Sequence, residues 1–224
     1  MLVLCYILTA FAAYLLGSIP TGYLIGQAKG VDIRTVGSKN MGATNVFRSI
    51  GKTLGIFVLL VDALKGYAAC AFIPPLIYNW LAPHFSGLIV YFHNEPVGLQ
   101  TRFYVLAGIC AILGHNYTCW LKFRGGKGIA TTAGVMAAWV PWAFLIVVGI
   151  FTVLFAATRY VSVGSIAGAA ALPFATWFTT HDVGLTVITG LLGALAIFKH
   201  KKNIQRLMDG TENRIVFKKT EAAK

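Results

Sequence analysis

The fold class is decided by residues 54–73, which read LGIFVLLVDALKGYAACAFI. This stretch has about the 20 residues that a helix needs to cross a hydrocarbon core of about 30 Å. It contains two charged residues, Asp62 and Lys65, which are unfavourable in lipid unless they face the interior of a helix bundle. They stand three positions apart and can therefore pair on one helix face. We predict a membrane-spanning helix in which this pair has either a structural or a direct catalytic role.

Apolar stretches of similar length lie on both sides of this one. The run 128–157 is too long for one span and contains Pro141, which predicts a short fourth helix before the proline and a fifth after it. Pro74 and Pro75 are expected to end the span at 54–73. We predict an all-α integral membrane protein, a bundle of about seven transmembrane helices whose other spans are residues 2–25, 103–121, 163–178 and 183–198.

The composition supports this class of protein. The 224 residues are 57% hydrophobic and 12% charged, and that charged share is about half of what soluble domains carry. No linker or low-complexity stretch divides the sequence, so residues 1–224 are predicted to form a single membrane-embedded domain. A net charge of +12 would suggest nucleic acid binding in a soluble protein. Here the basic residues lie between apolar runs, so no nucleic acid partner is predicted, and four cysteines without a C-x-x-C pair predict no metal site.

The basic residues also predict the orientation in the membrane, because cytoplasmic loops are enriched in Lys and Arg. They gather in residues 29–52 and 122–127, at Arg159 and in the chain from residue 199 onward. The connections on the other side include a long segment, 78–102, which carries a single basic residue, Arg102. The N-terminus is therefore predicted outside and the C-terminus inside, with residues 199–224 as a cytoplasmic tail.

Three segments on the predicted cytoplasmic side hold most of the polar residues that a membrane bundle does not itself require. The first, residues 31–48, reads VDIRTVGSKNMGATNVFR. If a helix begins near Gly42, then Asn45, Arg48 and Lys52 would share one cationic face. The alternative is a solvated loop whose charges only set the topology.

The second segment, FRGGKGIATT at residues 123–132, opens the predicted fourth helix with glycines and a lysine. Backbone N–H groups at a helix start, the positive end of the helix dipole and the Lys127 ammonium would together bind a phosphate. The segment is not a Walker A loop, because the earlier glycine of that motif and the Ser or Thr after Lys127 are both missing. A packing turn with a lysine that sets the topology is the alternative.

The third segment, HKKNIQRLMDGTE at residues 200–212, follows the last predicted span. In a helix, His200 and Asn203 would share one face, and apolar residues from Ile204 to Met208 would rest on the membrane surface. An amphipathic anchor is the alternative. No histidine of the sequence is followed by Asp at the fifth position, so a His/Asp base is not predicted. His115 is expected to be a hydrogen-bonded packing residue beside the third span.

Five motifs are together similar to the bacterial acyl-phosphate-dependent glycerol-3-phosphate acyltransferase family. In chain order they are GSIPTGYLIG at 17–26, VGSKNMGATNVFR at 36–48, DALKG at 62–66, GHNYTCWLKFRGGKGIAT at 114–131 and HKKNIQRLMDGTE at 200–212. They extend over nearly the whole chain, and the main departure is the longer segment at 78–102. The combination is far more specific than any single glycine loop.

This resemblance implies that a fatty acyl group is transferred from acyl phosphate to the first hydroxyl of glycerol 3-phosphate, which gives lysophosphatidic acid and phosphate. That reaction is the first acylation step of phospholipid synthesis. The resemblance also implies a location in the bacterial inner membrane with the active site on the cytoplasmic face, no cofactor or metal, and a soluble enzyme that forms the acyl phosphate as a partner.

The same resemblance implies the site residues. The catalytic residues would be Ser38, Arg48, Lys127, His200 and Asn203. The substrate-binding residues would be Thr44, Asn45, Gly125, Gly126, Lys127, Gly128 and Thr131.

Two other functions are compatible with membrane helices and a cationic site. A transporter or flippase of a phosphorylated solute or lipid would place its site near the membrane midplane between inverted repeats, whereas these motifs gather at one face. A purely structural membrane subunit would leave the three polar segments unexplained.

Overall fold

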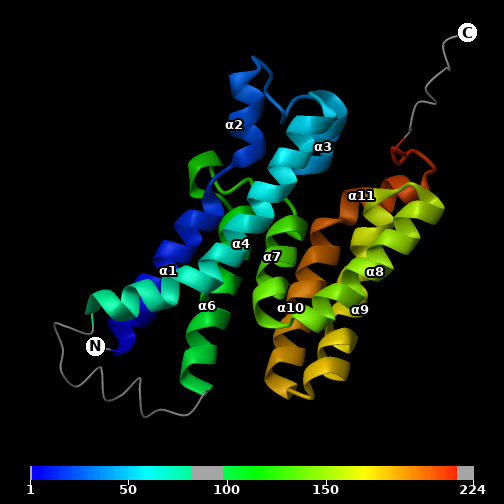
Figure 1. Cartoon of the computed structure of the whole chain (residues 1–224). Helices are drawn as coiled ribbons and strands as arrows, with labels where there is room; N and C mark the ends of the chain where they lie inside the picture. Colours follow the sequence, from blue (N-terminus) through cyan, green and yellow to red (C-terminus); the bar gives the residue numbers. More distant parts are fainter. Residues whose placement is uncertain (1, 82–97, 216–224) are drawn as a thin grey trace, which may run out of the picture. The chain divides into compact units, whose positions relative to one another are not determined.

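The computed structural model describes residues 2–81 and 98–215, and Figure 1 shows how the chain runs. Over these residues the chain forms helices and no strands, as predicted. The chain divides into two compact units, Met1–Pro141 and Trp142–Lys224, and each is described by itself. The prediction of one domain over residues 1–224 is not tested by this division and stays a prediction.

Four helical segments of the described chain are long and apolar enough to cross a membrane, or five if a bent pair near the C-terminus counts as one. They are Leu2–Ala28, Lys52–Ile77, Pro141–Thr158 and Val161–Thr180, with Val183–Lys199 and Lys201–Met208 as the bent pair. The shorter helix Ile129–Trp139 is apolar as well. The count of about seven spans and the orientation of the two termini stay predictions.

The first unit is built around three long helices, α1 (Leu2–Ser18), α4 (Lys52–Leu81) and α6 (Gly98–Asn116), with the short α7 (Ile129–Trp139). Small residues let their backbones approach closely. A side chain at Gly17 of α1 would collide with the Ala111 carbonyl of α6, and one at Gly134 of α7 would collide with the Ala63 carbonyl of α4. Interhelical contacts through small residues are the usual way in which membrane helices associate.

A break separates α1 from α2 (Thr21–Ala28), and it falls at Ile19-Pro20. A break frees backbone carbonyls that need hydrogen-bond donors when they are buried. The hydroxyl of Thr118 donates to the Ser18 carbonyl at 2.6 Å, and the Lys65 ammonium donates to the Ile19 carbonyl at 2.8 Å. The broken helix is therefore held by residues from α4 and from the chain that follows α6.

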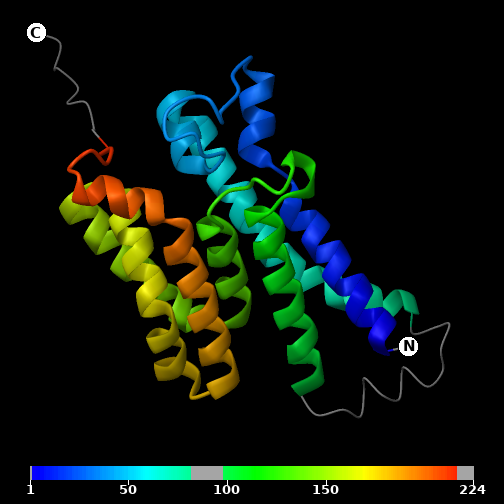
Figure 2. The same ribbon diagram turned by 180° about the vertical axis from the view of Figure 1, so that it is seen from behind.

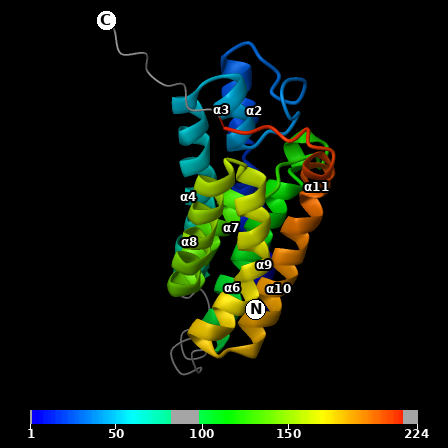
Figure 3. The same cartoon turned by 90° about the vertical axis from the view of Figure 1, so that its right-hand side faces the viewer.

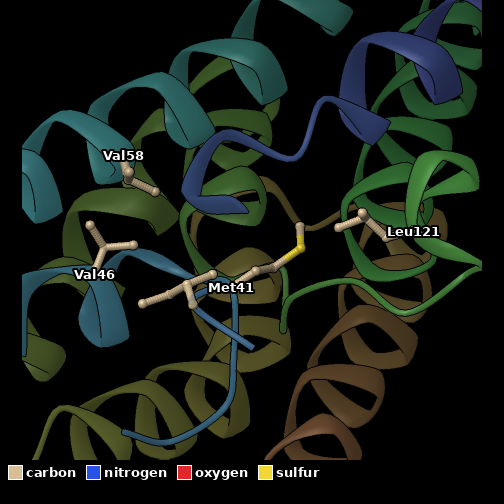
Figure 4. Packing of buried hydrophobic residues seen from close by; sticks show 5 residues of the cluster. Met41, Val46, Val58 and Leu121 are labelled. Atoms are coloured by element: carbon tan, nitrogen blue, oxygen red, sulfur yellow. The ribbon is translucent and has the colours of Figure 1, made fainter. Parts of the chain in front are cut away.

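A hydrophobic cluster fixes the polar loop between α2 and α4. Figure 4 shows Met41 and Val46 from this loop and its helix α3 (Ala43–Ser49) beside Val58 of α4 and Leu121. Leu121 belongs to the short 3-10 helix η2 (Cys119–Leu121), which follows α6. The cluster thus ties the first polar segment to the chain that leads into the glycine loop.

Two helix ends differ from the sequence prediction. The helix α4 continues through Pro74 and Pro75 to Leu81, although the sequence predicts that these prolines end it. Proline costs a helix one hydrogen bond and crowds the preceding turn, but membrane helices tolerate it where neighbours satisfy the freed groups. The helix α6 ends at Asn116 and not near residue 121 as predicted. Thr118 lies outside the helix, where its hydroxyl donates a hydrogen bond to the Ser18 carbonyl.

The second unit contains α8 (Pro141–Thr158, whose first residue belongs to the first unit), α9 (Val161–Thr180), α10 (Val183–Lys199) and α11 (Lys201–Met208). Figure 3 shows α9 and α10 running side by side, joined by a tight turn. Asp182 caps the start of α10 by accepting a hydrogen bond from the Leu185 N–H at 2.8 Å. The chain then bends by 55° between α10 and α11, and the same bend is visible from behind in Figure 2.

Candidate functional site

The first polar segment is organised around one buried amide, that of Asn45 in α3. Its Nδ2 atom donates to the carbonyls of Ile33, Val36 and Asn40 at 2.8–3.1 Å. Its Oδ1 atom accepts the backbone N–H of Ser38 at 2.9 Å. Asn45 is 2% exposed, and so many bonds to one loop make it the residue that shapes the segment.

The loop carries three of the predicted site residues at its surface. Ser38, Thr44 and Arg48 are each half-buried, and Arg48 lies in the last turn of α3. Ser38 is positioned from both sides, since Asn45 binds its N–H group and its neighbours Gly37 and Lys39 both have a positive φ of 56°. The side-chain hydroxyl of Ser38 is therefore presented by a tight, fixed turn.

The helix predicted near Gly42 begins there, with Gly42 as its N-cap. The prediction that Asn45, Arg48 and Lys52 share one helical face is wrong. The helix α3 ends at Ser49, and Lys52 is the first residue of α4. Asn45 points into the loop, so the cationic face is reduced to Arg48.

The glycine segment folds back onto the end of α6. The N–H of Gly126 donates to the His115 carbonyl at 3.0 Å, and that of Gly125 donates to the Asn116 carbonyl at 3.2 Å. These two N–H groups are occupied by the protein itself. An anion bound at this loop would therefore meet Lys127 and the first turn of α7, where a helix leaves its initial N–H groups without intrahelical partners.

The glycines are required by close contact as well as by backbone conformation. Gly128 has a φ of +78° and caps the start of α7. A side chain at Gly126 would collide with the imidazole Nε2 of His115, and one at Gly128 would lie 2.7 Å from the Asn116 amide oxygen. The residues His115 and Asn116 thus form the protein wall behind the loop.

Two predicted binding residues lie at the start of α7 or beside it. Lys127 is half-buried between Gly126 and Gly128. Thr131 is completely buried, and its hydroxyl has no hydrogen-bond partner among the described residues. A buried hydroxyl without a partner is costly, and a polar group that reached it would recover that free energy.

The ion pair predicted inside the second span is present. The Nζ atom of Lys65 lies 2.8 Å from Oδ1 of Asp62, and both side chains are at most 4% exposed. The same Oδ1 accepts a hydrogen bond from the Thr21 hydroxyl at 3.0 Å and lies 3.7 Å from Nδ1 of His115. His115 is buried, as expected, but it belongs to a charged cluster.

The third polar segment lies in the second unit. His200 is the junction residue between α10 and α11, and its Nδ1 lies 2.8 Å from the Ala196 carbonyl. Because a carbonyl can only accept, Nδ1 carries the proton. Asn203 stands in the first turn of α11, and its N–H donates to the His200 carbonyl at 2.7 Å. Both side chains are buried, and their shared role in a site stays a prediction.

Glu212 is a residue that the sequence prediction missed. It is 7% exposed and accepts hydrogen bonds from Asn203 and Ser162 on Oε1, at 2.7 and 2.9 Å, and from Arg206 on Oε2 at 2.7 Å. Burial raises the pKa of Glu212, but the hydrogen bonds from Asn203, Arg206 and Ser162 outweigh it and hold the pKa below its ordinary value. The motif already contained Glu212 nine positions after Asn203, but nothing in that spacing reveals the fold-back that joins them.

The predicted residues therefore fall into three groups. Ser38, Thr44, Asn45 and Arg48 share the loop before α4, and residues 125–128 with Thr131 share the start of α7, both in the first unit. His200 and Asn203 share the junction of α10 and α11 in the second unit. In the part of the chain that the structure describes, no group of three or more His, Cys, Asp or Glu side chains could hold a metal ion.

The model of the glycerol-3-phosphate acyltransferase family matches residues 7–210 of this sequence. The chain belongs to this family. A glycerol-3-phosphate acyltransferase of Geotalea daltonii is 43% identical over 213 residues, which cover 95% of this chain and 98% of the relative. One of Geobacter metallireducens is 46% identical over 208 residues, which cover 93% and 96%.

Solved structures of the family share the fold. The crystal structure of PlsY, described as an integral membrane glycerol 3-phosphate acyltransferase in its glycerol 3-phosphate form, matches with a TM-score of 0.79 and 34% identity. The match covers 94% of this chain and 96% of that one. Its lysophosphatidic acid form matches with a TM-score of 0.76 and 33% identity. As a member of this family with several apolar helices, the chain is a multi-pass membrane protein.

Proposed function

We propose that this protein transfers a fatty acyl group from acyl phosphate to the first hydroxyl of glycerol 3-phosphate. Membership of the acyltransferase family carries the class of reaction, and the two solved relatives are described with glycerol 3-phosphate and with lysophosphatidic acid. The choice of acyl phosphate as donor rests on the glycine loop. It offers Lys127 and a helix start to a phosphate, at the end of an apolar helix that suits a lipid tail.

The proposed roles of the residues are those that the resemblance to the family implies. Lys127, the start of α7 and the buried Thr131 hydroxyl would bind the acyl phosphate, with Gly125, Gly126 and Gly128 allowing its close approach. Glycerol 3-phosphate is a soluble dianion and would be bound by Ser38, Arg48, Lys127, His200 and Asn203. Thr44 would support this binding, and Asn45 would act by holding the loop that presents Ser38.

The reaction needs a place for one proton. The first hydroxyl oxygen of glycerol 3-phosphate attacks the acyl carbonyl carbon, the bond from that carbon to the phosphate oxygen breaks, and phosphate leaves. We propose that an oxygen of the departing phosphate takes the hydroxyl proton, so that hydrogen phosphate and lysophosphatidic acid are released. The protein would then contribute mainly orientation and stabilisation of negative charge, which together can supply most of a rate enhancement.

The deciding experiment is turnover by the purified protein. Palmitoyl phosphate and glycerol 3-phosphate should give lysophosphatidic acid and phosphate in equal amounts, without nucleotide, added metal or acyl-CoA. A strict requirement for acyl-CoA would overturn the proposed donor and leave the acyl transfer intact. Uptake of labelled glycerol phosphate into proteoliposomes without acyl phosphate would instead support the transport alternative, which no relative named above favours.

We further propose that the site faces the cytoplasm from the bacterial inner membrane and receives its donor from a soluble acyl-phosphate-forming enzyme. The clustered basic residues support this orientation. A membrane-impermeant thiol reagent should label Ser38→Cys and Asn203→Cys from the cytoplasmic side only. Labelling of both variants from outside intact cells would invert the orientation.

A further inference from the structure

The charged cluster inside the first unit has no part in the reaction proposed above, although it lies beside the glycine loop. Asp62, Lys65 and His115 are each at most 4% exposed. Burying charged groups in a membrane helix is unfavourable, and where it occurs it usually marks function. A structural ion pair alone does not explain why a histidine stands between the pair and the glycine loop.

The His115 ring contacts both sides at once. Its Nδ1 atom lies 3.7 Å from Oδ1 of Asp62. Its Nε2 atom occupies the place where a side chain at Gly126 would stand, with the ring carbons 3.0 and 3.1 Å from that position. These two nitrogens belong to one rigid imidazole ring, separated by a single carbon. A movement of the ring on its Asp62 side would therefore also displace the surface on which Gly126 rests.

Asp62 is itself held from three directions. Its Oδ1 atom accepts the Thr21 hydroxyl, pairs with Lys65 and faces His115. Lys65 in turn donates to the Ile19 carbonyl at the break between α1 and α2. The backbone carbonyl of His115 completes the arrangement, because it accepts the N–H of Gly126 at 3.0 Å.

We infer that Asp62 and Lys65 are positioning residues that fix the His115 ring as the support of the glycine loop, and so set where the acyl phosphate binds. This inference rests on the function proposed above. It predicts a larger effect on the acyl phosphate than on glycerol 3-phosphate. Of the residues proposed to bind glycerol 3-phosphate only Lys127 lies in the glycine loop, whereas Ser38 and Arg48 belong to a separate loop that Asn45 holds. It also predicts that the amides of Gly125 and Gly126 are protected from exchange by this cluster.

The first test separates positioning from stability. Removing one member of a buried ion pair is strongly destabilising, whereas replacing both by apolar residues of similar volume is often neutral. We therefore compare Asp62→Leu and Lys65→Met with the double variant Asp62→Leu/Lys65→Met. Thr9→Val is the matched control, because Thr9 is a fully buried hydroxyl of α1 without a hydrogen-bond partner among the described residues.

The expected result is a double variant that melts at a higher temperature than either single variant but still binds acyl phosphate poorly. Its KM for palmitoyl phosphate should rise on the order of tenfold to a hundredfold, the effect of a misplaced binding group. Its KM for glycerol 3-phosphate should rise less than its KM for palmitoyl phosphate, because only one of the proposed glycerol 3-phosphate contacts, Lys127, lies in the glycine loop. A double variant that regains both its melting temperature and its KM for palmitoyl phosphate would show a purely structural pair and overturn the inference.

A second readout does not depend on turnover. Deuterium exchange of the peptide covering residues 123–129 should be faster in the double variant than in wild type or Thr9→Val, while a peptide covering residues 42–49 should be unchanged. If the peptide covering residues 123–129 exchanged no faster in the double variant than in wild type, the inference would be contradicted. If the wild-type protein showed no turnover with palmitoyl phosphate, the proposed function would fail, and this measurement would still decide whether the cluster supports the loop.

A third experiment tests the contact between His115 and Gly126. Gly126→Ala should impair palmitoyl phosphate turnover because the new Cβ collides with the ring, and Gly126 has no left-handed conformation that alanine would strain. Combining it with His115→Ala removes the obstacle. The double variant should therefore be at least about tenfold more active than the product of the two single effects predicts. Effects that multiply independently would show that the ring does not support the loop.

Discussion

The glycine loop of the first unit and the turn after α11 that carries Glu212 in the second unit (the Glu212 turn) are both polar segments beside a helix end, but they are held in different ways. The glycine loop is fixed by many contributions: two backbone hydrogen bonds to the end of α6, the His115 ring and the ion pair behind it. The Glu212 turn depends on one carboxylate that accepts hydrogen bonds from three side chains. We expect single changes in the glycine loop itself to show mainly in activity, and single changes at Glu212 to show mainly in stability.

The largest effect is expected at Lys127 in the first unit. Lys127→Ala should lower kcat/KM for palmitoyl phosphate by about 100-fold or more, because losing a charge-assisted contact to a developing anion costs about 3 kcal/mol. Its melting temperature in detergent should not change. Lys122→Ala is the matched control, since Lys122 is an exposed lysine of the same connection. Near-normal activity of a folded Lys127→Ala protein would show that Lys127 only helps to set the orientation in the membrane.

The counterpart in the second unit is Glu212→Ala, for which we expect a loss of stability. Asn203, Arg206 and Ser162 lose their common acceptor, and hydrogen bonds to charged groups contribute about 1.5–3 kcal/mol each. With partial relaxation, a net loss of about 3 kcal/mol corresponds to a melting temperature lower by roughly 6–12 °C. Glu212→Gln retains an acceptor and should lose less than half as much. An unchanged melting temperature for Glu212→Ala would remove the contrast between the two units.

His200 tests whether the second unit also contributes to chemistry. In His200→Gln a hydrogen-bonding side chain is kept, so KM for glycerol 3-phosphate should rise by about tenfold while kcat at saturation stays within about tenfold. The Ala196 carbonyl accepts the Nδ1 proton, so a neutral His200 ring has no proton on Nε2, as a general base would require. Losing a general base slows turnover by roughly 100- to 10,000-fold. If kcat of His200→Gln fell by that much while its KM stayed unchanged, His200 would be the base in the wild-type enzyme. The proton of the glycerol 3-phosphate hydroxyl would then pass to His200 and not to the departing phosphate.

The smallest effect is expected in how the melting temperature depends on pH, and it comes from the Glu212 carboxylate. The pKa of folded Glu212 lies below the unfolded value of 4.5, so its stabilisation is complete above that pH and is lost as the pH falls through the lower, folded pKa. Glu212→Gln should therefore lose less of its melting temperature than wild type between pH 5 and pH 3. Asp32→Asn is the control: Arg34 holds the pKa of Asp32 at about 2, but this exposed pair should contribute little. Parallel pH curves for wild type and Glu212→Gln would contradict the expectation.

Local signals in the sequence predicted much of the first unit. The apolar stretches indicate the helical class, Gly42 marks the start of α3, and the spacing of Asp62 and Lys65 predicts their ion pair. The glycine loop is expected at a helix start, and α7 begins directly after Gly128. These features depend on neighbours within a few positions, which is the range over which sequence patterns are informative.

The features that sequence reasoning missed depend on distant residues. Pro74 and Pro75 argue for a helix end locally, but α4 continues through both, and Ile77 beyond them packs against Cys5 and Phe103. Nothing near Gly125 or Gly126 shows that their N–H groups are taken by the end of α6, which removes them from the expected phosphate site. The role of Glu212 requires the chain to fold back onto Asn203 and Ser162, fifty positions earlier.

The uninterrupted course of α4 through two prolines has a mechanical consequence. Its 30 residues extend over about 45 Å, whereas the hydrocarbon core is about 30 Å thick. Pro74 and Pro75 cannot bond to the carbonyls of Cys70 and Ala71, so the helix bends most easily there, two turns beyond Lys65. We expect thinner or thicker bilayers to be accommodated by that flexible segment, so that activity in nanodiscs changes little with lipid length. Bending at the prolines would thus keep the position of Asp62, Lys65 and His115 unchanged when the membrane thickness changes.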